Sequence, residues 1–123
     1  MLSAANRLTD AQSYRTVIRS GRRAGSRTLV VHWCDPGTGG PSTSGPRVGL
    51  IVSKAVGNAV TRNRVQRRLR HLTREQIERL SPTGMLVIRA LPVSASAGYL
   101  ELRGDLDRCL HRVLAATVPE RTT

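Results

Sequence analysis

The sequence predicts an α+β fold, a single domain in which helices pack on one sheet. Segments 28–34, 47–53 and 85–90 are rich in apolar and β-branched residues and are typical of strands. Segments with apolar residues at helical spacing precede, separate and follow them. The chain has 123 residues and is 39% hydrophobic, enough for one modest core but not for two. We therefore expect an α/β sandwich with the order α-β-β-α-β-α.

The first helix is expected from about Asp10 to Ser20. Thr9 and Gln12 fit a capping box at its start. Its apolar stripe consists of Tyr14, Val17 and Ile18. Residues 1–8 before the helix and 117–123 at the end of the chain are expected to be flexible tails of a single domain that comprises residues 1–123.

Two strands follow the first helix. The sequence TLVVHWC at 28–34 predicts the first of them and Arg47 to Ser53 the second. Between them, DPGTGGPSTSG at 35–45 contains mainly Gly, Pro, Ser and Thr, which predicts a flexible loop.

A long helix is expected from Asn58 to Leu80, starting after Gly57 and ending before Ser81-Pro82. It joins the second strand to the third, at 85–90. The general expectation for such a crossover between parallel strands is a right-handed connection.

The last helix is expected beyond Pro92, with Ser94 or Ser96 as its cap. Its apolar residues recur at helical spacing: Tyr99, Leu102, Leu106, Leu110, Val113 and Leu114.

The long helix carries five arginines within nine residues, Arg62 to Arg70, and no acidic residue occurs from Pro36 to Arg74. Its apolar positions Val65, Leu69 and Leu72 share one face, while arginines cover most of the rest. A merely solvated helix face usually interleaves both signs of charge, which this one does not. The cluster therefore indicates binding to a polyanion.

Composition supports nucleic acid as that polyanion. The net charge is +12, and every basic residue except Lys54 is an arginine, whose planar fork matches phosphate oxygens. RNA or DNA fits this chemistry better than a membrane does. No segment suits a membrane span or a signal peptide, so a cytoplasmic protein is expected.

Side chains for protein-based catalysis or metal binding are not grouped in the sequence. Cys34 and Cys109 lie far apart and are expected in the core. The acids are scattered, and Asp105 and Asp107 are expected to be exposed on the last helix. The histidines show no metal-ligand spacing. We expect no catalytic side chain and no cofactor bound by the protein alone.

The segment RVGLIVSKAVGNAVTRNRVQRRLR resembles the signature of the bacterial ribonuclease P protein family, and the resemblance spans about residues 6–116. Family membership implies an α/β sandwich of the ribonuclease P protein and ribosomal protein domain 2-like type. It implies a left-handed crossover, against the general expectation. The implied function is that of a subunit that binds a catalytic RNA and the 5′ leader of precursor tRNA, while the RNA and its Mg²⁺ ions remove the leader.

The resemblance assigns two sets of residues. Those implied to face the catalytic RNA are Lys54, Asn58, Arg62, Asn63, Arg64, Arg67, Arg68 and Arg70. Those implied to form the leader cleft are Tyr14, Ile18 and His32, with Trp33 pointing to the opposite face. Asn58 is about as well explained as a helix cap alone. Gln66 and Ile18 depart from the family pattern, which carries lysine and an aromatic residue there. A core role is the alternative for Ile18.

Two other functions remain as alternatives from the sequence. A ribosomal-type protein or RNA chaperone would have a similar composition, but the ordered Arg62-Asn63-Arg64 signature argues against it. A protein-only nuclease is disfavoured by the lack of clustered carboxylates. Neither a membrane nor DNA is an expected partner.

Overall fold

The structure is a computed structural model that describes residues 7–8, 10–35 and 45–115. The expected tails and most of the expected loop at 35–45 lie outside these residues. The described elements run in the following order: α1 (Ala11–Ser20), β1 (Arg22–Gly25), β2 (Leu29–Cys34), β3 (Arg47–Ile51), α2 (Ala59–Gln76), η2 (Ile77–Arg79), β4 (Met85–Ala90), η3 (Pro92–Ala95) and α3 (Tyr99–Ala115).

The strands form one sheet in the order β1-β2-β4-β3. Strand β2 is antiparallel to β1 and β4, whereas β3 and β4 are parallel and are joined through α2. The predicted α+β class and the β-α-β unit are confirmed; the left-handed sense of the crossover stays a prediction.

The predicted element order was wrong in omitting β1. Residues Arg22–Gly25 pair with β2 in the register Arg22 to Trp33 and Ala24 to Val31. The strand has four residues, of which only Ala24 is buried. It therefore lacks the apolar run by which the longer strands are found.

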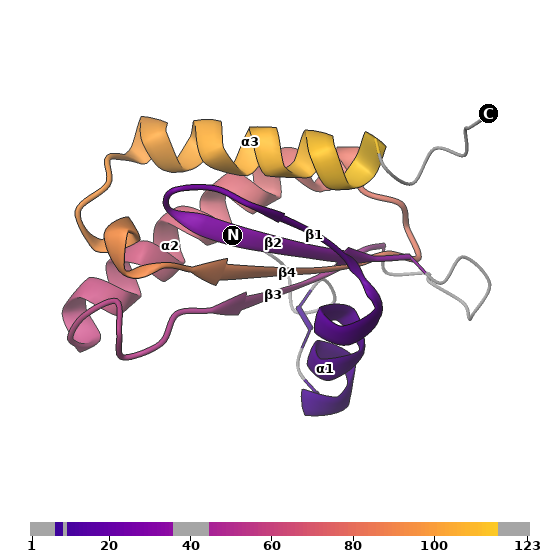
Figure 1. The fold of residues 1–123 in the computed structure, drawn as a ribbon, viewed down its shortest axis with the longest axis horizontal. Coiled ribbons are helices and arrows are strands. Elements are labelled where there is room, and N and C mark those ends of the chain that lie inside the picture. The colour runs from indigo at the N-terminus through magenta and orange to yellow at the C-terminus, as the bar shows by residue number, and fades with distance from the viewer. Residues whose placement is uncertain (1–6, 9, 36–44, 116–123) are drawn as a thin grey trace.

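The helices cover the sheet on both faces. Helices α2 and α3 lie on one face and α1 on the other (Figure 1). The larger core lies beneath α2 and α3 and contains the expected α2 stripe, Val65, Leu69 and Leu72, each at most 1% exposed. A smaller core beneath α1 contains Leu8, Val17 and Val87.

The helix ends confirm one expected cap and correct two others. Asn58 caps α2, since its Oδ1 accepts a hydrogen bond from the Thr61 N–H at 2.9 Å. The cap of α1 is Asp10, which accepts from the Ser13 N–H at 2.9 Å. Helix α3 starts at Tyr99, and Ser96 instead donates from its hydroxyl to the Val93 carbonyl. Ser94 is buried within η3. The predicted Ser94 or Ser96 cap was therefore wrong.

Asp105 is buried at 3% exposure, so its predicted exposure was wrong. Its Oδ2 accepts hydrogen bonds from the Thr28 hydroxyl at 2.6 Å and the Thr28 N–H at 3.2 Å, and its Oδ1 pairs with Arg108. Burial alone would raise the pKa of Asp105, but the Thr28 hydrogen bonds and Arg108 outweigh burial and lower it. Asp107 is exposed as expected and pairs with Arg79. Cys109 is buried and Cys34 is partly buried.

Candidate RNA interface

The residues implied to face a catalytic RNA gather along α2 and the segment before it, and we call them the α2 surface: Lys54, Asn58, Arg62, Asn63, Arg64, Arg67, Arg68 and Arg70. The apolar stripe of α2 is fixed against the sheet, which turns the other side of the helix outward. Lys54, Asn58, Asn63 and Arg67 are exposed, and the remaining four are half-buried.

The guanidinium groups of Arg64 and Arg68 are held in place by the backbone of the segment before α3. Arg64 Nη2 donates to the Ala95 carbonyl at 2.9 Å, and Arg68 Nη1 donates to the Ala97 carbonyl at 3.2 Å. Each contact uses part of a guanidinium that has five N–H donors. The two side chains therefore tie α2 to the end of η3 and to Ala97 beyond it, and still carry donors for phosphate.

Charge on the α2 surface is not compensated by acids. The ion pairs between described residues are Arg27–Glu101, Arg79–Asp107, Arg108–Asp105 and His71–Glu75, and none includes an arginine of α2. Arg70 donates only to the neutral Gln66 side chain, at 3.5 Å. A solvated structural helix would pair such charges along its length. The arginines of α2 therefore lack an anionic partner among the described residues, as expected of a surface that binds an external polyanion.

The three residues of the predicted leader cleft all lie on the α1 side of the sheet, but their environments differ. The end of the Tyr14 ring covers Gly49 of β3, where an added Cβ would lie 2.4 Å from Tyr14 Cζ. Ile18 is 38% exposed. His32 is only 3% exposed, which disfavours stacking of a base on its ring. The role of these residues in leader binding stays a prediction.

Two arginines, Arg23 and Arg89, flank His32, and of these Arg89 was missed in the sequence. Burial lowers the pKa of His32, and the positive charges of Arg89 and Arg23 lower it further. The ring nitrogens of His32 and the Nε of Arg89 are buried without a partner among the described residues. Strand alternation would have identified Arg89, because Leu86, Ile88 and Ala90 face the larger core and Arg89 must face the α1 side.

A small cavity of about 120 Å³ connects the two predicted surfaces. Tyr14, from the α1 side of the sheet, lines it together with Leu50 of β3, which packs against the larger core, and with Gln66 and Arg70 of α2. Burial raises the pKa of Tyr14, against the opposing effect of a hydrogen bond with the Leu50 backbone. Arg70 and Tyr14 thus line the same cavity, and the role of each in RNA binding stays a prediction.

Metal-binding side chains are not grouped in the described part of the chain. No set of three or more His, Cys, Asp or Glu residues there is arranged to hold a metal ion. None of the helices in residues 10–35 and 45–115 is long and apolar enough to cross a membrane.

The family model and the relatives that this chain matches all concern the same enzyme, ribonuclease P. The family model for ribonuclease P matches residues 2–114. The ribonuclease P protein component of a Nocardioides species is 57% identical over 92% of this chain and 95% of that protein. The protein of the same name from Mycobacterium avium is 44% identical over 97% of this chain and 100% of that protein.

Solved structures with the same fold come from more distant relatives. The RNase P protein of Staphylococcus aureus has a TM-score of 0.74 at 22% identity, covering 92% of this chain and 96% of that one. The RNase P protein of Thermotoga maritima has a TM-score of 0.71 at 20% identity, covering 87% and 96%. These likenesses establish the fold.

Proposed function

Since the chain belongs to the family of ribonuclease P protein components, we propose that its α2 surface is the part that binds the catalytic RNA subunit of ribonuclease P. The chain is a subunit of that endoribonuclease, acts in tRNA processing and is a partner of the ribonuclease P RNA. Membership excludes the alternatives of a ribosomal-type protein and an RNA chaperone.

The uncompensated arginines of α2 are the observation that carries this proposal. Arg62 and Arg67 lie outside the buried stripe, and no ion pair between described residues includes them. Arginine binds phosphate oxygens in pairs, and such contacts supply most of the affinity of a protein for a nucleic-acid backbone. Asn58 is a helix cap in the structure, and we propose that its exposed amide also contacts RNA.

The second part of the proposal concerns precursor tRNA. The cleft between α1 and the sheet would hold the single-stranded 5′ leader, with Tyr14 stacking on a base and Ile18 at its border. Arg23 and Arg89 would provide positive charge for the leader phosphates. His32, being buried, would support the floor of the cleft and contribute no stacking.

The third part assigns the chemistry to the RNA. The described residues contain no cluster of carboxylates for a two-metal site, so this part of the chain does not fit the Mg²⁺ ions of the holoenzyme and we assign them to the RNA. The protein would hold substrate and RNA together, in the cytoplasm.

Reconstitution tests this division of labour. Cleavage of precursor tRNA is measured with the catalytic RNA alone, the protein alone and both, each in Mg²⁺. We expect the protein to stimulate cleavage by the RNA and to cleave nothing alone. Cleavage by RNA-free protein would contradict the assignment of chemistry to the RNA, and a lack of stimulation would contradict the subunit role.

A further inference from the structure

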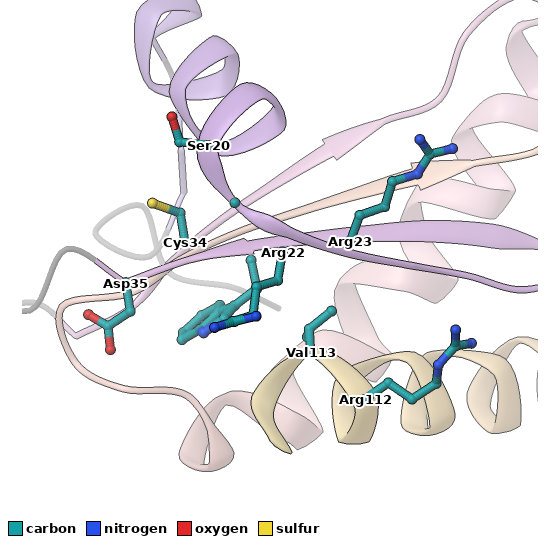
Figure 2. Close-up of a pocket in the computed structure, with 9 residues that line it drawn as sticks. Ser20, Arg22, Arg23, Cys34, Asp35, Arg112 and Val113 are labelled. Atoms are coloured by element: carbon teal, nitrogen blue, oxygen red, sulfur yellow. The ribbon is translucent and has the colours of Figure 1, made fainter. Parts of the chain in front are cut away.

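A second basic surface lies at the β1 edge of the sheet. The strand order puts β1 at one edge and β3, which leads into α2, at the other. Arg22 and Arg23 of β1 and Arg112 of α3 line a cavity of about 880 Å³ there (Figure 2). Among the described residues that line it, Asp35 is the only acidic one. We call this the β1-edge surface.

The arginines of the β1-edge surface differ from their neighbours in charge compensation. Arg27 and Arg108, which line the adjoining cavity, are paired with Glu101 and Asp105. No ion pair between described residues includes the three arginines of the β1-edge surface. Arg112 donates to a neutral group, the Gly25 carbonyl, at 3.2 Å, and the Asp35 carboxylate accepts from the Thr83 hydroxyl at 2.6 Å. The surface thus retains positive charge.

Strand alternation divides this surface between the two faces of the sheet. Arg22 lies opposite Trp33 in the ladder and faces α3, while Arg23 lies opposite His32 and faces α1. Arg23 therefore belongs to the leader side. Arg22 and Arg112 form the part that neither the α2 surface nor the leader cleft uses.

The chemistry of this part favours RNA over a protein partner. Protein interfaces are centred on exposed apolar and aromatic side chains. The exposed large hydrophobic residues of the described chain are Ile18, Val60, Val93 and Leu100, and none lines this cavity. Arginine-rich, polar surfaces are typical of nucleic-acid binding.

We propose that Arg22 and Arg112 bind the phosphate backbone of an RNA segment other than the one bound by the α2 surface. The protein would then contact RNA at opposite edges of its sheet. The choice of RNA as the ligand rests on the proposed function. The segment comes either from the catalytic RNA or from precursor tRNA, which present the same phosphate chemistry.

The salt dependence of binding tests this proposal. The full chain is compared with Arg22→Gln/Arg112→Gln and with the control Arg74→Gln/Arg103→Gln, which removes two charges from exposed helix positions outside both surfaces. Affinity is measured over a salt series for the catalytic RNA, and separately for precursor tRNA added to the assembled holoenzyme. The slope of log affinity against log salt should decrease by about 1.4–1.8 for the double variant, in the arm whose RNA supplies the segment. The control should keep the wild-type slope in both arms.

Arg22→Gln alone retains the bond from Arg112 to Gly25 and should decrease the slope by about 0.7–0.9. This single variant replaces the double variant in the test if the double variant shows a changed circular dichroism spectrum. Unchanged slopes in both arms would overturn this inference, and are also the result expected if an acidic protein occupies the surface. Failure of the wild-type chain to bind the catalytic RNA would instead contradict the proposed function.

Discussion

Gly49→Ala should disturb the leader cleft without removing any of its side chains. The end of the Tyr14 ring lies over Gly49, and an added Cβ would be 2.4 Å from the Cζ and hydroxyl oxygen of Tyr14. The ring must therefore move by about 1 Å to reach the 3.4 Å at which ordinary contact begins. A displacement of this size can abolish stacking on a base, which is worth about 1–3 kcal/mol.

Affinities of the holoenzyme for precursor tRNA and for mature tRNA measure this effect. Gly49→Ala should weaken binding of precursor tRNA by up to about 5- to 150-fold, the equivalent of one stacked base. Mature tRNA has no leader, so its affinity should change little. Tyr14→Ala should show the same selectivity. Crowding at Gly49 should also lower the free energy of unfolding by about 1–3 kcal/mol, measured by urea denaturation.

Gly98→Ala is the matched control, because an added Cβ there meets nothing within 4 Å. It should leave both tRNA affinities and the free energy of unfolding near their wild-type values. Equal losses for precursor and mature tRNA with Gly49→Ala would refute the leader role of Tyr14. Unchanged affinity for both would refute it as well, provided that urea denaturation shows the expected destabilisation.

Two further predictions concern stability. Asp105→Asn should lower the free energy of unfolding at neutral pH by about 1.5–3 kcal/mol, because Thr28 loses a charged acceptor. Folding lowers the pKa of Asp105. The difference in free energy of unfolding between wild type and variant should therefore be present above the unfolded-state pKa of about 3.9 and shrink as pH falls below it. If urea denaturation showed the same difference in free energy of unfolding between wild type and Asp105→Asn down to the lowest pH, this prediction would be contradicted. Folding also lowers the pKa of His32, so the unfolded chain binds more protons below about pH 6.5, and wild type should lose stability from there downward. His32→Leu should remove that part of the pH dependence, and an unaltered urea-denaturation profile would show that His32 does not cause it.

The sequence was sufficient for the elements whose signals are local. The cap at Asn58, the buried stripe of α2 and the bounds of β4 were predicted as the structure has them. Each depends on residues within one element, where side-chain periodicity and a cap residue suffice.

Features that depend on distant contacts were missed. Asp105 is buried because Thr28, separated from it by 77 positions in the chain, supplies two donors. Strand β1 exists because it pairs with β2, although three of its four residues are exposed.

The candidate site shows the same division. Exposure of Arg67 followed from its position off the apolar stripe. The bonds from Arg64 and Arg68 to the Ala95 and Ala97 carbonyls depend on how the segment between β4 and α3 lies against α2, which periodicity does not encode. The burial of His32 likewise depends on the elements packed around it.

The salt dependence of binding to the catalytic RNA, with and without two α2 arginines, tests the central claim most directly. Arg62→Gln/Arg67→Gln removes charges that tie α2 to no other described element by a hydrogen bond or an ion pair. We predict weaker binding with a slope of log affinity against log salt that is smaller by about 1.4–1.8, an unchanged circular dichroism spectrum, and no such change for Arg74→Gln/Arg103→Gln. Wild-type affinity and slope in the Arg62→Gln/Arg67→Gln variant would contradict the assignment of α2 as the surface that binds the catalytic RNA.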